Sequence, residues 1–119
     1  MNRVFLLGRL GHEPAPRRTR GGKTVMEMRV ATRRPGRGGE ETTDWHQVRV
    51  WEQLAEACAE HLRAGSPVAV EGQLRAESWI DREGTAHSRT FVLGDRVHFL
   101  PDPRPAPKAQ GTPSVDAVG

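Results

Sequence analysis

The sequence predicts an all-β domain that carries one short helix, and two patterns in the chain support this. Apolar and polar residues alternate with a period of two over five stretches, as they do in strands that bury one face. These stretches are 3–10, 23–33, 44–51, 67–80 and 87–100. Between the third and the fourth stretch the apolar period lengthens to about four, which is typical of an amphipathic helix.

The first two predicted strands are separated by a turn-rich segment, residues 12–22, which contains two prolines and a Gly-Gly pair. In the first strand one face carries Val4, Leu6 and Gly8 and the other carries Phe5, Leu7 and Arg9. In the second strand Met26, Met28 and Val30 alternate with Glu27, Arg29 and Ala31. A loop rich in arginine and glycine then follows over 34–43. We therefore expect a turn-rich connection before the second strand and a flexible loop after it.

In the third strand the two faces differ sharply in chemistry. One face carries His46, Val48 and Val50, and the other carries Trp45, Gln47, Arg49 and Trp51. Because the valines suit the core, the two indoles and the arginine between them are expected to point outward. Indoles beside an arginine suit a surface that stacks nucleobases and neutralises phosphate, although a partly buried core position for each indole is the competing interpretation.

The helix is predicted over 52–63, where Leu54, Cys58 and Leu62 recur every four residues, and Gly65 follows as a stop. Cys58 is the single cysteine, so the chain can form no internal disulfide and no Cys-rich zinc site. We interpret it as a small buried hydrophobe, with a reactive thiol as the alternative.

The last two strands are expected to form a hairpin around residues 81–84. In the fourth strand Val68, Val70 and Leu74 share one face, and Gly72 indicates a bulge or bend of the kind that barrel closure requires. Five strands with one helix between the third and the fourth is the layout of an OB-fold, a five-stranded, partly open Greek-key barrel that binds oligonucleotides. We assign this domain to residues 1–100.

After residue 100 the composition changes, because five of the nine prolines lie in 101–119 and no apolar period remains. We predict that this segment is a disordered, Pro-rich tail. No apolar run approaches the roughly 20 residues that a membrane span needs, and the start lacks the features of a signal peptide. The expected location is the cytoplasm, in association with the nucleoid, without membrane attachment.

Charge is distributed unevenly along the chain, whose formal net charge is +3. Residues 1–37 hold ten Lys or Arg residues against Glu13 and Glu27, whereas residues 38–119 are acidic overall. A basic segment of this kind favours a polyanionic partner, nucleic acid first, over its alternative, a solvated arm. The five histidines show no metal-ligand spacing, and no nucleophile and base occur together, so we expect no metal, no cofactor and no enzymatic activity.

Over residues 1 to about 100 the chain resembles the bacterial single-stranded-DNA-binding protein family. The resemblance rests on the order and spacing of short motifs rather than on any one of them. These motifs are Asn2-Arg3-Val4, Leu7-Gly8-Arg9-Leu10-Gly11, Glu13-Pro14, Gly21-Gly22, Val30-Ala31-Thr32, Asp44-Trp45-His46, Leu54-Ala55-Glu56, Leu62-Arg63-Ala64-Gly65-Ser66 and Val70-Glu71-Gly72-Gln73-Leu74-Arg75, followed by Trp79. The family is a non-enzymatic OB-fold that forms homotetramers and winds single-stranded DNA over its outer surface.

The resemblance implies which residues contact DNA. Trp45, Trp51 and Trp79 match family positions whose aromatic side chains stack bases, and Arg9 and Arg75 match positions that face the DNA path. A further family aromatic is missing near Gly36, where this chain has arginines instead, so phosphate contact is expected to replace stacking there and to raise salt sensitivity. The arginines expected to contact phosphate are Arg9, Arg33, Arg34, Arg49 and Arg75.

The function implied is sequence-nonspecific binding and protection of single-stranded DNA in replication, repair and recombination. The acidic, Phe-terminated tip with which family members recruit replication and repair proteins has no counterpart in residues 113–119, so such partners stay open. The alternatives are an OB-fold paralogue without a tail that acts in a primosome-type or RNA-binding role, and a structural subunit of an assembly.

Overall fold

The computed structural model describes residues 1–105 and contains six strands and one α-helix. The strands are β1 (Val4–Leu10), β2 (Arg17–Arg18), β3 (Thr24–Pro35), β4 (Glu41–Trp51), β5 (Pro67–Ile80) and β6 (Ala86–Phe99). The helix α1 (Glu52–His61) lies between β4 and β5, and a 3₁₀ turn (Arg37–Gly39) lies between β3 and β4.

The barrel closes because β1 pairs with two strands. Along most of its length β1 is antiparallel to β5, and its last two residues, Arg9 and Leu10, pair with Ala31 and Val30 of β3. The ring then continues from β5 to β6, from β6 to β4 through a short parallel pairing, and from β4 back to β3. Five strands thus form the closed barrel with the helix between the third and fourth of them, which confirms the predicted OB-fold. The two-residue β2 is an addition to it.

The core lies inside this barrel and beneath α1. It is formed by the apolar faces that the alternation predicted, among them Met26, Met28, Val30, Val48, Val50, Val68 and Val70, together with Ala55 and Cys58 of the helix. Burial removes water from the Cys58 thiol and raises its pKa to about 12, so the group stays protonated at neutral pH. Cys58 is therefore the small buried hydrophobe of the first interpretation.

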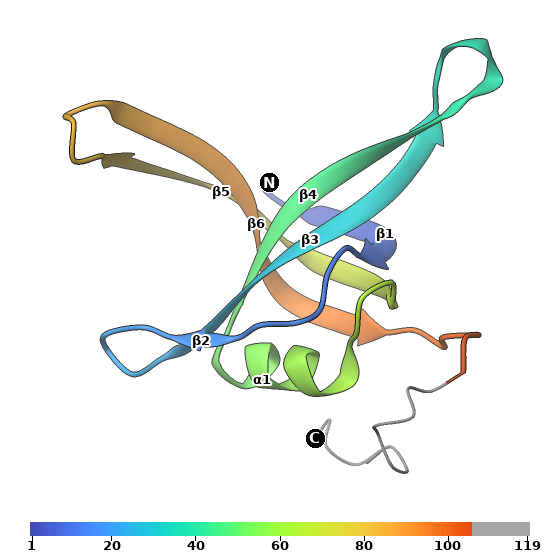
Figure 1. The fold of residues 1–119 in the computed structure, drawn as a ribbon, viewed down its shortest axis with the longest axis horizontal. Helices are drawn as coiled ribbons and strands as arrows, with labels where there is room; N and C mark the ends of the chain where they lie inside the picture. The colour runs from blue at the N-terminus through green and yellow to red at the C-terminus, as the bar shows by residue number, and fades with distance from the viewer. Residues whose placement is uncertain (106–119) are drawn as a thin grey trace.

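Two hairpin arms project from the barrel (Figure 1). The outer ends of β3 and β4 form one arm, and the outer ends of β5 and β6 form the other. A register shift at Gly72 marks where β5 passes from the barrel into its arm, as predicted, and side chains beyond it, such as Leu74 and Ile80, are exposed.

The flexible loop predicted over 34–43 is shorter in the structure, because pairing of β3 with β4 continues out to Pro35 and Glu41. Salt bridges across this arm join oppositely charged side chains, Arg34 with Asp44 at 2.7 Å and Arg33 with Glu41 at 3.5 Å. These pairs, together with the β-branched threonines at 42 and 43, favour an extended hairpin over a loop.

The start of the predicted tail contacts the segment after the helix. Asp102 accepts hydrogen bonds from Arg63 and Arg104, and Arg104 also donates to the carbonyl of Ala64. Residues 106–119 of the predicted tail lie outside the described residues. Within residues 1–105 no helix is long and apolar enough to cross a membrane, and no three potential metal ligands come together.

Candidate nucleic-acid interface

The outer face of β3 and β4 presents two of the three tryptophans. Trp45 lies opposite Ala31 and Trp51 lies opposite Val25, so both indoles stand on the side away from the core. Trp45 is 50% exposed and Trp51 is 37% exposed, whereas Val48 and Val50 are fully buried. The strand parity inferred from the sequence is confirmed, and these indoles are not core residues.

Trp45 rests on a platform made by its neighbours. The guanidinium of Arg29 lies 4.6 Å from the centre of the indole, a cation–π distance. On the backbone side, a Cβ atom at Gly11 would lie 2.4 Å from Cζ3 of Trp45, so only glycine allows this close approach. Arg9 is exposed and stands in the same cross-strand row, because it pairs with Ala31. A half-exposed indole and two exposed arginines, Arg9 and Arg29, thus lie on the same face of the sheet.

Arg49 lies between Trp45 and Trp51 but has a different environment from the other predicted arginines. Only 13% of its side chain is exposed, and its guanidinium bridges Glu27 of β3 and Glu77 of β5. It also lies 4.0 Å from the centre of the Phe91 ring. Because two carboxylates already compensate its charge, Arg49 on β4 is held as a link to β3 and β5.

The same link keeps Glu77 ionised. Hydrogen bonds from Arg49 and then from Arg89 lower the pKa of Glu77 to about 2, and the hydrogen bond with Glu77 raises the pKa of Arg49. A carboxyl with a lowered pKa stays charged above that value, so both ion pairs persist through the neutral range and weaken only in strong acid. The link from Arg49 of β4 to Glu77 of β5 is therefore insensitive to pH under physiological conditions.

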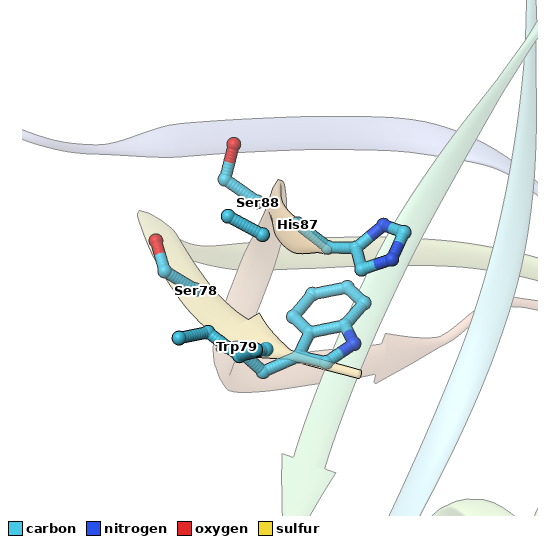
Figure 2. A pocket seen from close by; sticks show the side chains of 6 residues that line it. Ser78, Trp79, His87 and Ser88 are labelled. Atoms are coloured by element: carbon cyan, nitrogen blue, oxygen red, sulfur yellow. The ribbon is translucent and has the colours of Figure 1, made fainter. Parts of the chain in front are cut away.

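Trp79 stands on the other arm and is stacked on a histidine. The rings of Trp79 and His87 face each other (Figure 2). Their centres are 5.3 Å apart and their planes differ by 17°. His87 Nε2 lies 2.7 Å from a carboxylate oxygen of Asp81, which fixes the ring, and Arg89 lies 5.2 Å from the indole centre. A hollow of about 440 Å³ at this place is lined by Ser78, Trp79, Ile80, Ala86, His87 and Ser88.

The remaining predicted arginines lie on the arms. Arg75 is exposed on β5 and shares a strand face with Trp79, and its guanidinium donates to Gln73. Arg33 and Arg34 are exposed near the end of the β3–β4 arm, where each pairs with a carboxylate of β4. The structure thus places Arg9 in the same cross-strand row as Trp45, and Arg75 on the strand of Trp79. Arg33 and Arg34 lie further out.

The sequence pattern did not reveal the side chains of β6 and β3 that complete this surface. On β6, the Phe91 ring lies beneath Arg49, Arg89 donates to Glu77, and His87 stacks on Trp79. On β3, Arg29 lies over the indole of Trp45. The signal for the β6 residues was available: the turn at 81–84 sets a register that pairs Trp79 with His87. Counting outward from that turn would have placed Arg89 opposite Glu77 and Phe91 opposite Arg75.

Comparison with known proteins gives matches over the whole barrel. The family model described as "Single-strand binding protein family" matches residues 1–100. The chain is 37% identical over 102 residues to the "Single-stranded DNA-binding protein" of Caldanaerobacter subterraneus subsp. tengcongensis, covering 84% of this chain and 68% of the relative. It is 34% identical over 87 residues to the "Single-stranded DNA-binding protein 1" of Chlorobaculum tepidum, covering 70% of this chain and 54% of the relative. The family match includes every strand described above.

Proposed function

Because the chain belongs to the single-strand binding protein family, we propose that it binds single-stranded DNA without sequence preference and protects it during replication, repair and recombination. The observation that supports this most strongly is the set of three partly exposed indoles, Trp45, Trp51 and Trp79, on the outer side of the barrel and its arms. The protein is expected to cover the strand without catalysing a reaction, and to do so in the cytoplasm, where the chromosome lies.

Stacking on an indole explains the absence of sequence preference. Every nucleobase has a π-face, and stacking on an aromatic side chain contributes about 1–3 kcal/mol per base whichever base it is. Exposed arginines of the barrel and its arms, Arg9, Arg33, Arg34 and Arg75, supply phosphate contacts that are equally indifferent to sequence, with Arg33 and Arg34 further out than the others. Arg49 contributes indirectly in this proposal, because it ties β4 to β3 and to β5.

This function predicts a clear order of affinities. Oligonucleotides of dT, dA and dC should all bind and quench tryptophan fluorescence, because stacked bases lie against the indoles. A duplex of the same length should bind far more weakly, since its bases are already stacked and paired. Titrations followed by fluorescence, with an RNA oligonucleotide in parallel, test this. Equal affinity for duplex, or tighter binding of RNA than of DNA, would contradict it and favour the RNA-binding alternative.

The same chain is proposed to form a homotetramer. Phe5 and Leu7 of β1 point outward and are 68% and 70% exposed, next to Ala69 of β5. Within the described residues β3 pairs with β1 only at Arg9 and Leu10, so the other edge of β1 over residues 4–8 is open as well. An exposed apolar face beside an open strand edge is a feature that proteins usually cover, here by a second copy of the chain.

Light scattering should therefore give the mass of a tetramer at micromolar concentration. A variant with both Phe5→Asp and Leu7→Asp should give a smaller species, because the charges would be buried in the contact. Ile80→Asp is the matched control: Ile80 is 71% exposed, but it lies near the tip of the β5–β6 arm. A monomeric wild-type protein, or a control that dissociates as the double variant does, would contradict the β1 interface.

A further inference from the structure

The turn that joins β2 to β3 carries a concentration of positive charge that the function above does not use. Residues 17–23, called here the basic hairpin, contain four basic residues and no acidic one: Arg17, Arg18, Arg20 and Lys23. All four are exposed, and among residues 1–105 none of them forms a salt bridge. Their charge is therefore available to a partner.

The arginines of the β3–β4 arm contrast with this. Between residues 33 and 44 three arginines are matched by three acidic residues, and two of the arginines form salt bridges with Glu41 and Asp44. The charge of that arm is compensated within the arm itself. Uncompensated positive charge is concentrated at the opposite end of β3, where the chain leaves the basic hairpin (Figure 1).

Strand register places part of the basic hairpin on the same face as the tryptophans. Arg17 lies opposite Val25, and Val25 lies opposite Trp51, so the side chains of all three stand on one side of the sheet. Lys23 precedes Val25 by two residues and continues that side. The turn itself is held by hydrogen bonds from the Thr19 amide to the Lys23 carbonyl and from the Gly22 amide to the Thr19 carbonyl, with Gly22 at φ +84°.

Arg18 stands on the other side, toward two carboxylates of α1, whereas Glu27 on the side of Arg17 is already paired with Arg49. It lies opposite Thr24, whose hydroxyl donates to Glu56 and whose amide donates to Glu52, both on α1. Negative charge from the helix thus lies toward Arg18 and away from Arg17. The two neighbouring arginines have the same charge and belong to the same strand, but they face different surroundings.

We propose that the path of single-stranded DNA continues past Trp51 onto the basic hairpin, where Arg17 and Lys23 contact phosphates of the strand. This rests on the proposed function and extends its binding surface. From Val25 to the tip of the turn at Arg20 is five residues, which adds about 16 Å to the path at the rise of a β-strand. On this path Trp51 contacts an interior nucleotide of the bound DNA and not one at its end.

The test compares the double variant Arg17→Ala/Lys23→Ala with Arg18→Ala, using a long oligo-dT at a series of salt concentrations. The slope of log affinity against log salt falls by about 0.7 for each single-strand phosphate contact that is lost. We expect a fall of about 1.4 for the double variant, if both residues make one contact each, and little change for Arg18→Ala. Arg17→Lys keeps the charge and should keep the slope of the wild-type protein.

Two further measurements separate this proposal from the function on which it rests. Oligo-dT should still quench the tryptophans of the double variant at low salt, and its thermal unfolding should match that of the wild-type protein, because the changed side chains are exposed. If wild-type protein did not bind oligo-dT at all, the proposed function would fail. If the double variant kept the wild-type slope, or changed no more than Arg18→Ala, the DNA path over the basic hairpin would be wrong while the function stood.

Discussion

Alanine in place of Trp45, Trp51 and Trp79 together is expected to weaken binding of oligo-dT by about 3–9 kcal/mol, if each indole contributes separately. Even the lower figure is a loss of more than about a hundredfold in affinity. The cause is that each change removes a stacking surface while the arginines remain. Because these are the only tryptophans of the chain, the variant has no intrinsic indole signal, and fluorescence anisotropy of a labelled oligonucleotide is the measurement to use.

Single replacements distinguish stacking from a structural role. Trp51→Ala should lose about 1–3 kcal/mol of binding free energy and little stability, whereas Trp51→Phe should recover part of the binding because phenylalanine also stacks. Circular dichroism and thermal unfolding serve as the control on the fold. A Trp51→Ala protein that unfolds would return this residue to the core, in agreement with the competing interpretation of the sequence.

The second large effect is on stability and concerns Gly8 of β1. A Cβ atom at this position would lie 1.9 Å from the carbonyl oxygen of Ala31 in β3, a backbone atom that cannot turn aside. Gly8→Ala therefore has to push β1 away from β3 where the barrel closes. Overpacking of this kind costs typically about 1–3 kcal/mol, and we expect a loss at or above the upper end of that range, measured by urea unfolding.

Gly21→Ala is the matched control for this change. Gly21 lies in the turn of the basic hairpin, and the nearest atom to an added Cβ is 3.9 Å away, in ordinary contact. The same chemical change should leave the unfolding midpoint nearly unaltered there. Equal midpoints for Gly8→Ala and the wild-type protein would show that the approach of β1 to β3 is looser than the structure has it.

Much of the fold follows from the sequence because its signals are local. The alternation in β3 and β4 separates Met26, Met28, Val48 and Val50 from the outer face, and that one inference already turns Trp45 and Trp51 outward. Gly72 signals its bulge because a glycine inside a strand often marks a bulge or a tight bend of the backbone. β2 escaped prediction for the opposite reason, since two residues are too few to show a period.

The environment of the site residues was harder to foresee, because it depends on which strands become neighbours. Arg49 resembles a phosphate-binding residue when only β4 is considered. Its pairing with Glu77 and its contact with Phe91 arise from strands that lie further along the chain and reach it only through closure of the barrel. Gly11 and Trp45 meet in the same way, from segments that periodicity treats separately.

If a nucleobase stacks on Trp79 as proposed, we expect the stack of His87 on that indole to make DNA binding at the β5–β6 arm an exchange reaction. A nucleobase that takes the place of the imidazole gains its own stacking free energy and gives up that of the histidine, so only the difference contributes to affinity. Trp79 carries both the His87 ring and the Arg89 guanidinium, whereas the described contact of Trp45 is with Arg29 alone, so a base that stacks on Trp45 has less to displace. Two indoles of similar exposure are therefore unequal as ligands for bases, and a strand that is too short to occupy both should settle first at Trp45.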